Sequence, residues 1–77
     1  MSKRLQITAT EKTWLKVNID KKESREFILN PGDVLEFEAS QGYNLLIGNA
    51  TGVQLTLDNT EVTVPGRQGQ VVSLDLP

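Results

Sequence analysis

The chain has 77 residues, the length of one domain, and a chain of this size buries only about 60% of the surface that it exposes when unfolded. It contains neither cysteine nor histidine. Disulfide bonds and thiolate metal sites are therefore excluded, and the usual general base near neutral pH is missing. Eight Lys and Arg against ten Asp and Glu give a net charge of −2, too balanced for a dedicated nucleic-acid binder.

The first half of the chain predicts three strands, because apolar and polar residues alternate with period two. They cover residues 4–9, 13–19 and 26–29, and the polar segment 20–24 reverses the chain before the third. A helix over residues 11–27 is disfavoured by the strict alternation from Leu15 to Ile19. The residues expected to point inward are Leu5, Ile7, Ala9, Leu15, Val17, Ile19, Phe27 and Leu29.

A type II turn is predicted at "NPGD", because Pro31 fixes its own φ and Gly32 accepts a positive φ. Further strands follow at residues 34–39, 43–48, 53–58, 61–64 and 70–76, with a turn at Asn59 and Thr60 and a loop at residues 65–69. The residues assigned to turns by their type are Pro31, Gly32, Gly48, Asn49, Gly52 and Gly66. Gly48, Asn49 and Gly52 belong to "GNATG", which is interpreted as a bend or bulge between two core strands.

Seven to eight short strands separated by turn residues predict an all-β fold, a small antiparallel immunoglobulin-like β-sandwich. Residues 1–77 are expected to form one domain, and a strand that runs almost to the last residue suggests that this domain is excised from a longer protein. No apolar run approaches the roughly 20 residues that span a bilayer, so the isolated chain is expected to be soluble.

Charge is distributed unevenly along the sequence. Residues up to Arg25 carry a charge of +4, and those from Glu26 onward carry −6. Two interpretations stay open: opposite ends of the domain carry opposite charge, or these residues are the solvated outer faces of strands.

Little in the sequence indicates catalysis. Glu36 and Glu38 share one strand face about 7 Å apart, but an open strand face offers no concave substrate site. We therefore expect a protein that is not an enzyme and that uses no metal or other cofactor.

Trp14 is the most informative residue, because the alternation places it on the polar face of its strand, beside Lys16. The same alternation places Ile28, Val34, Leu46 and Val71 outward. Outward apolar residues on several strands indicate a surface that binds a partner. A bulge after Thr13 would instead turn the Trp14 ring into the core. The candidate interaction surface is Trp14, Lys16, Ile28, Val34, Tyr43 and Leu46.

The strings "TWLKV", "LNPGD", "LLIGNATGVQLTLDN" and "VPGRQGQVVSLDL", in this order, resemble the C-terminal extracytoplasmic domain of the bacterial cell-shape protein RodZ. The resemblance covers residues 5–76. Residues that match the family pattern are Trp14, Pro31, Gly32, Gly48, Asn49 and Val53. The family supplies no catalytic residue.

The resemblance implies an immunoglobulin-like domain outside the cytoplasmic membrane, in the periplasm or on the outer face of that membrane. Full-length members add a cytoplasmic helix-turn-helix domain that binds the actin-like protein MreB, and one transmembrane helix; this chain carries neither. The expected partner is a protein of the cell-wall elongation machinery or peptidoglycan, and this domain is not expected to bind nucleic acid. Two alternatives are a small carbohydrate-binding module that stacks Trp14 or Tyr43 on a sugar ring, and a structural spacer without a specific ligand.

Overall fold

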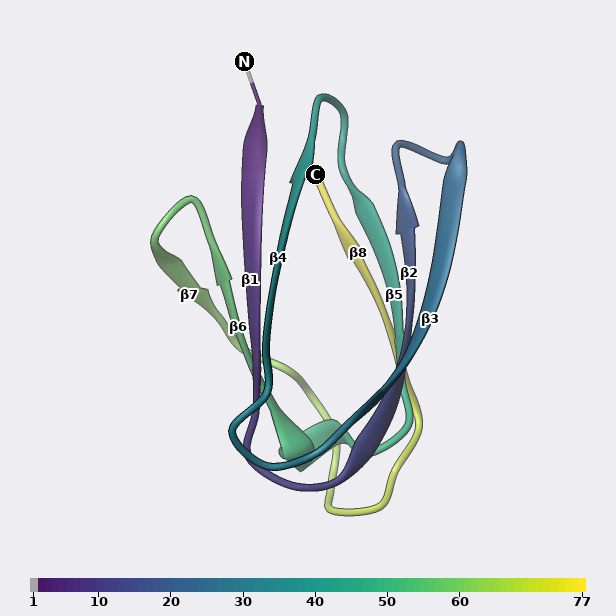
Figure 1. Ribbon diagram of the computed structural model, residues 1–77, viewed down its shortest axis with the longest axis vertical. Coiled ribbons are helices and arrows are strands. Elements are labelled where there is room, and N and C mark those ends of the chain that lie inside the picture. Colours follow the sequence, from purple (N-terminus) through teal and green to yellow (C-terminus); the bar gives the residue numbers. More distant parts are fainter. Residues whose placement is uncertain (1) are drawn as a thin grey trace.

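In the computed structural model, which describes residues 2–77, eight strands form two antiparallel four-stranded sheets that pack face to face (Figure 1). The first sheet has the order β4 (Val34–Ala39), β1 (Lys3–Ala9), β6 (Val53–Leu57) and β7 (Thr60–Val62). The second has the order β3 (Glu23–Leu29), β2 (Thr13–Ile19), β5 (Tyr43–Ile47) and β8 (Val72–Leu76). The predicted all-β sandwich is confirmed.

The core lies between the sheets and is built from the residues that the alternation points inward. Because successive side chains of a strand face opposite sides, each central strand presents one apolar row to the other sheet. Burying one such side chain contributes about 1.5–3 kcal/mol to folding. The largest fully buried side chains come from β1, β2, β5 and β6: Leu5, Ile7, Leu15, Val17, Leu45, Ile47 and Leu55.

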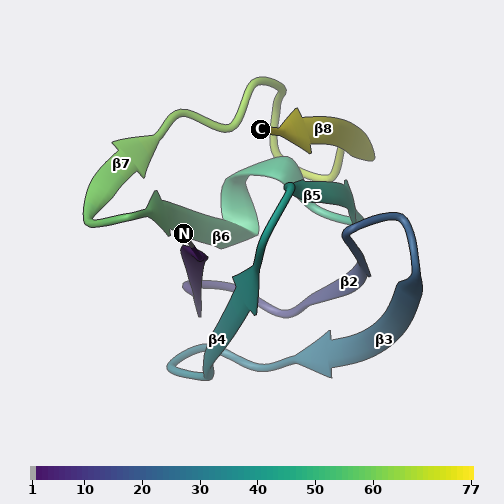
Figure 2. The same cartoon turned by 90° about the horizontal axis from the view of Figure 1, so that it is seen from above.

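The edge strands β3 and β4 lie beside one open side of the sandwich, and β7 and β8 lie beside the other (Figure 2). Apolar side chains from these strands pack against the core. Between β3 and β4, the rings of Phe27 and Phe37 pack with centroids 5.8 Å apart, in a tilted arrangement that is favourable for aromatic pairs. Val62, Val64 and Leu74 pack against the core from the strands and loop on the other side.

The turn at Pro31 and Gly32 has the predicted geometry. Gly32 has a φ of 95°, and the Asp33 N–H donates to the Asn30 carbonyl at 3.0 Å. The Gly32 N–H also donates to the carbonyl of Ala9, at 2.9 Å, so this turn is joined to the end of β1.

Some predicted boundaries are wrong by one or a few residues. The reversal between β6 and β7 uses Asp58 and Asn59, one residue earlier than expected, because both adopt the positive φ (50° and 66°) that a two-residue hairpin turn requires and that Asp and Asn tolerate. β3 begins at Glu23, so the loop before it is shorter than residues 20–24. The loop before β8 is longer and covers residues 63–71.

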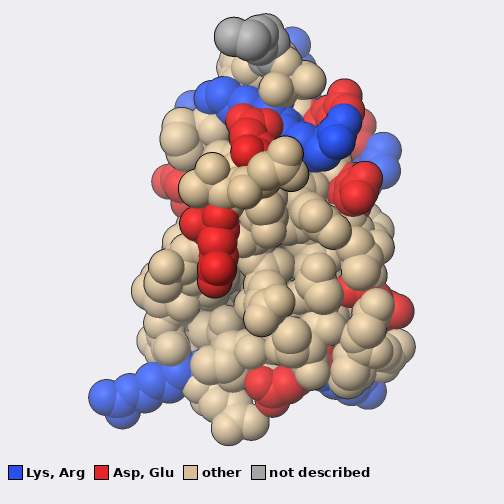
Figure 3. Space-filling model, turned by 90° about the vertical axis from the view of Figure 1, so that its left-hand side faces the viewer, with Lys and Arg blue, Asp and Glu red and all other residues tan. Residues whose placement is uncertain are grey.

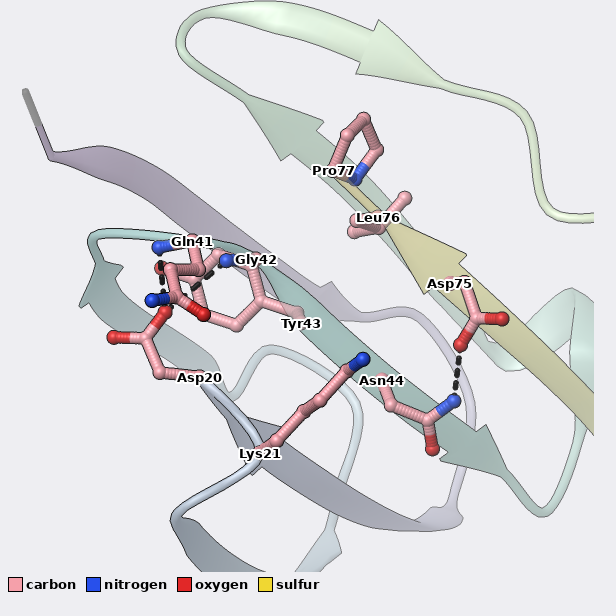
Figure 4. Close-up of a pocket in the computed structure, with 9 residues that line it drawn as sticks. All are labelled: Asp20, Lys21, Gln41, Gly42, Tyr43, Asn44, Asp75, Leu76 and Pro77. Carbon is pink, nitrogen blue, oxygen red and sulfur yellow. Dashed lines mark hydrogen bonds between the residues drawn. The ribbon is translucent and has the colours of Figure 1, made fainter.

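Asp20 joins two turns at the end of the molecule where the N-terminus lies (Figure 4). It has a φ of 54°, an uncommon conformation for a residue other than glycine. Its carboxylate accepts hydrogen bonds from the backbone N–H groups of Ser40, Gln41 and Gly42 at 3.0, 2.6 and 3.1 Å, and from the Ser40 hydroxyl at 3.2 Å. These bonds attach the β2–β3 turn to the β4–β5 turn.

Stability should therefore depend on the charge of Asp20. Hydrogen bonds from the backbone of Ser40 and Gln41 lower the pKa of Asp20 from its ordinary value of 3.8 to about 2. A lowered pKa means that the folded state binds this proton less readily than the unfolded state, so the stabilisation is complete above pH 4 and disappears as the pH falls toward 2. We expect Asp20→Asn to lower the urea midpoint at pH 6 and to match the unsubstituted protein near pH 2.

Urea titrations at several pH values check this expectation. The matched control is Glu36→Gln, which removes an exposed carboxylate from β4. A constant difference between the Asp20→Asn variant and the unsubstituted protein from pH 6 to pH 2 would contradict the assigned role.

Positive and negative side chains are mixed on the surface, because every strand runs along the long axis and the two halves of the sequence lie side by side. Figure 3, which views the molecule from the side of β7, shows side chains of both signs near the end with the N-terminus and again near the opposite end, with a less charged centre. Arg4 of β1 lies 3.6 Å from Glu38 of β4. The interpretation of two oppositely charged ends is therefore wrong, and solvated strand faces fit the structure.

Candidate functional site

An apolar groove crosses the outer face of the β3-β2-β5-β8 sheet, near the end opposite the N-terminus. The register places Trp14 directly opposite Ile28, and Lys16 between Glu26 on one side and Leu46 on the other. These five residues line a shallow open groove of about 600 Å³, whose floor includes Leu15 and Phe27. We call the five the Trp14 groove. Four of the six residues predicted as an interaction surface thus lie together.

The Trp14 ring lies on the outer side of the sheet, as the alternation predicted. Regular pairing of β2 from Thr13 onward leaves no bulge that would turn it inward. Gly48 lies under the ring: a Cβ atom at this position would come within 2.5 Å of the indole Cδ1. The Gly48 N–H donates to the Trp14 carbonyl at 2.8 Å, so the two backbones are adjacent. Trp14 is thereby held in place while 43% of it stays exposed.

Two large apolar side chains of this groove are exposed next to each other. Ile28 is 74% exposed, and Trp14, which lies opposite it on β2, is 43% exposed. Large apolar side chains exposed side by side are uncommon on a soluble domain unless they contact something. Lys16 and Glu26 add one charge of each sign to the groove. This arrangement suits a ligand with an apolar centre and polar ends.

Two of the predicted surface residues lie elsewhere. Val34 is exposed but belongs to β4 of the other sheet, where it pairs with Thr8 of β1. Tyr43 is only 4% exposed, and its hydroxyl donates to the Lys3 carbonyl at 2.7 Å. The expectation that Tyr43 contacts a ligand or stacks on a sugar ring is therefore wrong, because its ring lies in the core beside the row of Leu45 and Ile47.

The "GNATG" segment is more than a bend. Residues Ala50–Gly52 form a short 3₁₀ turn, and Asn49 organises the loops around it. The Asn49 N–H donates to the Thr13 hydroxyl at 3.0 Å, and the Asn49 side-chain oxygen accepts from the N–H of Gly69 at 2.7 Å. Gly66 fits closely here, because a Cβ atom would lie 2.8 Å from Val72 Cγ2. These contacts fix the long loop before β8 next to the Trp14 groove.

Comparison with known proteins identifies the family. The sequence matches the RodZ C-terminal domain over residues 6–75, nearly the whole chain. The chain belongs to this family. Neither a curated protein nor a solved structure matches it. The family is a structural or interaction domain and not a known enzyme family, so this chain is a module of a RodZ-like cell-shape protein.

The RodZ C-terminal domain carries a polar row next to the groove on the same sheet face. The side-chain amide of Asn18 on β2 donates to Asn44 on β5 at 3.3 Å, and the amide of Asn44 donates to the carboxylate of Asp75 on β8 (Figure 4). The alternation did not single out these residues, because isolated Asn and Asp on an outer face are common. The row becomes visible only once the register of three strands is known.

The carboxylates that the sequence offered as a pair lie on an open strand face of this RodZ C-terminal domain. Glu36 and Glu38 lie on the exposed face of β4, and within residues 2–77 no three His, Cys, Asp or Glu side chains group as metal ligands would. The same part of the chain has no helix whose length and apolarity would let it cross a membrane. What the arrangement provides is an open apolar groove that carries one basic and one acidic side chain, Lys16 and Glu26.

Proposed function

We propose that this domain is the non-enzymatic extracytoplasmic interaction module of a RodZ-like protein and helps to connect the cell-shape cytoskeleton to the cell-wall elongation machinery. The observation that carries the proposal is the Trp14 groove, whose Trp14 and Ile28 side chains are exposed on one face. The family assignment supports a role in cell shape.

The proposed partner is a protein of the elongation machinery that places apolar side chains in the groove. Trp residues near the centre of an interface are often hot spots, because a large rigid ring loses little conformational freedom on binding. The ring of Trp14 is already fixed over Gly48. Its conformational entropy is therefore lost on folding and is not lost again when a partner binds. Lys16 and Glu26 at the margin would orient the partner more than they strengthen its binding.

Substitution of Ile28 tests the groove with a matched control in the same domain. We expect Ile28→Asp to reduce the capture of elongation proteins from solubilised cell envelopes at least about tenfold, because a carboxylate would be buried against apolar side chains. Val34→Asp should leave capture unchanged, since Val34 is also exposed, at 51%, but on the other sheet. Quantitative mass spectrometry of the proteins retained on the immobilised domain measures both.

Circular dichroism establishes that both variants are folded before capture is compared. Equal capture by the Ile28→Asp and Val34→Asp variants would remove the groove from the proposal. A second assay, co-sedimentation with purified peptidoglycan, addresses the carbohydrate alternative, for which only Trp14 remains as an exposed aromatic platform. If the unsubstituted domain sediments with peptidoglycan and Trp14→Ala is the one variant that does not, the result would favour the carbohydrate alternative over a protein partner.

A further inference from the structure

The free edge of β3 carries a charge pattern that is complementary to itself. β3 is a terminal strand of its sheet, pairing with β2 on one side, and residues 21–26 are all exposed. Around its start the sequence reads Lys22, in the turn before the strand, and then Glu23, Ser24, Arg25 and Glu26, so charges at equal distance from Ser24 have opposite sign. We propose that this edge binds a second copy of the chain, in an antiparallel β3-to-β3 pairing centred on Ser24.

Symmetry and pleating limit which registers are possible. When a two-fold axis perpendicular to the sheet relates two antiparallel strands, the same face of each strand lies on the same side of the sheet. Residues that lie opposite each other must therefore point to the same face, so their numbers are both odd or both even. Pairing centred on Ser24 places Glu23 of each copy opposite Arg25 of the other. It also places Lys22 of each copy opposite Glu26 of the other. Each opposite-charge pair therefore occurs twice.

The neighbouring registers are less favourable. Centring on Arg25 places the two Arg25 side chains opposite each other, and centring on Glu26 or Glu23 does the same with carboxylates. Charges on an edge strand usually prevent indiscriminate pairing. Among residues 22–26 their order also leaves one register in which each charge lies opposite a charge of the other sign.

The other three edges lack this complementarity. β7 has only three residues, and β8 has a single charged residue, Asp75. Self-pairing of β4 centred on any residue from Glu36 to Glu38 would bring carboxylates of the two copies opposite each other. The free edge of β3 has seven residues, and the register centred on Ser24 uses the first four, Glu23 to Glu26. In the single chain Arg25 already lies beside Glu23, in an exposed ion pair that screening by water makes weak and easily exchanged.

Pairing of this kind would continue the β3-β2-β5-β8 sheet across the two-fold axis and place both Trp14 grooves on the same side. The interface is small, because it consists mainly of one strand from each copy. We therefore expect a weak, reversible dimer, with a dissociation constant of the order of 100 µM.

Sedimentation equilibrium of the 77-residue domain, from about 10 µM to about 1 mM at low ionic strength, tests the proposal. Arg25→Glu should raise the dissociation constant at least about tenfold, because two attractive pairs become repulsive. The double variant Glu23→Arg/Arg25→Glu exchanges the two charges and should restore dimerisation. Urea unfolding confirms that each variant is folded. The same test is made at the outer pairs: Lys22→Glu should weaken the dimer, and the double variant Lys22→Glu/Glu26→Lys should restore it.

An unsubstituted protein that stays monomeric over the whole concentration range overturns the proposal. So does a dimer that Arg25→Glu leaves unchanged, or one that the double variant fails to restore. None of these results bears on the Trp14 groove, because capture by Ile28→Asp is measured independently of self-association.

Discussion

Leu45→Ala should destabilise the domain by about 3 kcal/mol, within the 2–5 kcal/mol typical of deleting a large side chain in a core. Leu45 has no exposed surface and lies in the middle of β5, opposite Val17 of β2 and Leu74 of β8. Both neighbours are fixed by backbone pairing, so the space left by the side chain cannot close easily. A domain of this size is stable by roughly 4 to 12 kcal/mol, and the loss is therefore a large fraction of the total.

The neighbouring residue provides the control. Leu46 faces the outer side of the same strand, so Leu46→Ala should cost less than about 1 kcal/mol. Urea unfolding followed by Trp14 fluorescence measures both variants, and equal slopes show that their free energies can be compared. If Leu46→Ala lowered the free energy of unfolding more than Leu45→Ala does, Leu46 and not Leu45 would point into the core.

Gly42→Ala should have the second largest effect, of about 2 kcal/mol, because an added Cβ atom has no space. The atom would collide with the carbonyl oxygen of Leu76 and lie 3.1 Å from the carbonyl carbon of Pro77. These are backbone atoms, so relief requires movement of the end of β8. On its other side Gly42 is held by Asp20, whose N–H donates to the Gly42 carbonyl at 2.9 Å. Neither neighbour can move without losing contacts.

Gly69→Ala separates crowding from backbone strain. Gly69 has a φ of 78°, but a Cβ atom there would meet nothing within 4 Å. Its substitution should therefore cost only the conformational penalty, about 1 kcal/mol. Urea midpoints and hydrogen exchange of the β8 amides distinguish the two variants. Equal urea midpoints of the Gly42→Ala and Gly69→Ala variants would show that the added Cβ atom at position 42 is not crowded. Unchanged hydrogen exchange of the Leu76 amide in Gly42→Ala would show the same.

The alternation of residues predicted most strands and faces, because that signal is local. β1, β2 and β4 follow the expected ranges closely, and Trp14 points outward as the alternation indicates, without the bulge that would have turned it into the core. The same alternation that places Leu46 outward places Tyr43 inward, so the burial of Tyr43 could have been predicted. Tyr43 is among the candidate surface residues because its side chain is aromatic.

Features that depend on pairing between distant strands could not be predicted. Gly48 reads as a turn residue in the sequence, yet its position under the Trp14 ring follows from the register between β2 and β5. Asp20 reads as one polar residue of a loop, and the acceptance of three backbone N–H groups requires residues 40–42 to lie beside it. Local sequence carries no information on which strand becomes the neighbour of another.

The strand order also determines how this domain reaches its folded state. Within residues 2–77, consecutive strands pair only in the β2–β3 and β6–β7 hairpins; every other pairing joins strands that are separated by at least two connections. Such pairings require large loops to close before they contribute stability, so folding should take milliseconds to seconds despite the short chain. The two hairpins can form locally within microseconds. The slow step is then the joining of β5 to β2 and of β1 to β4 and β6, which closes the core.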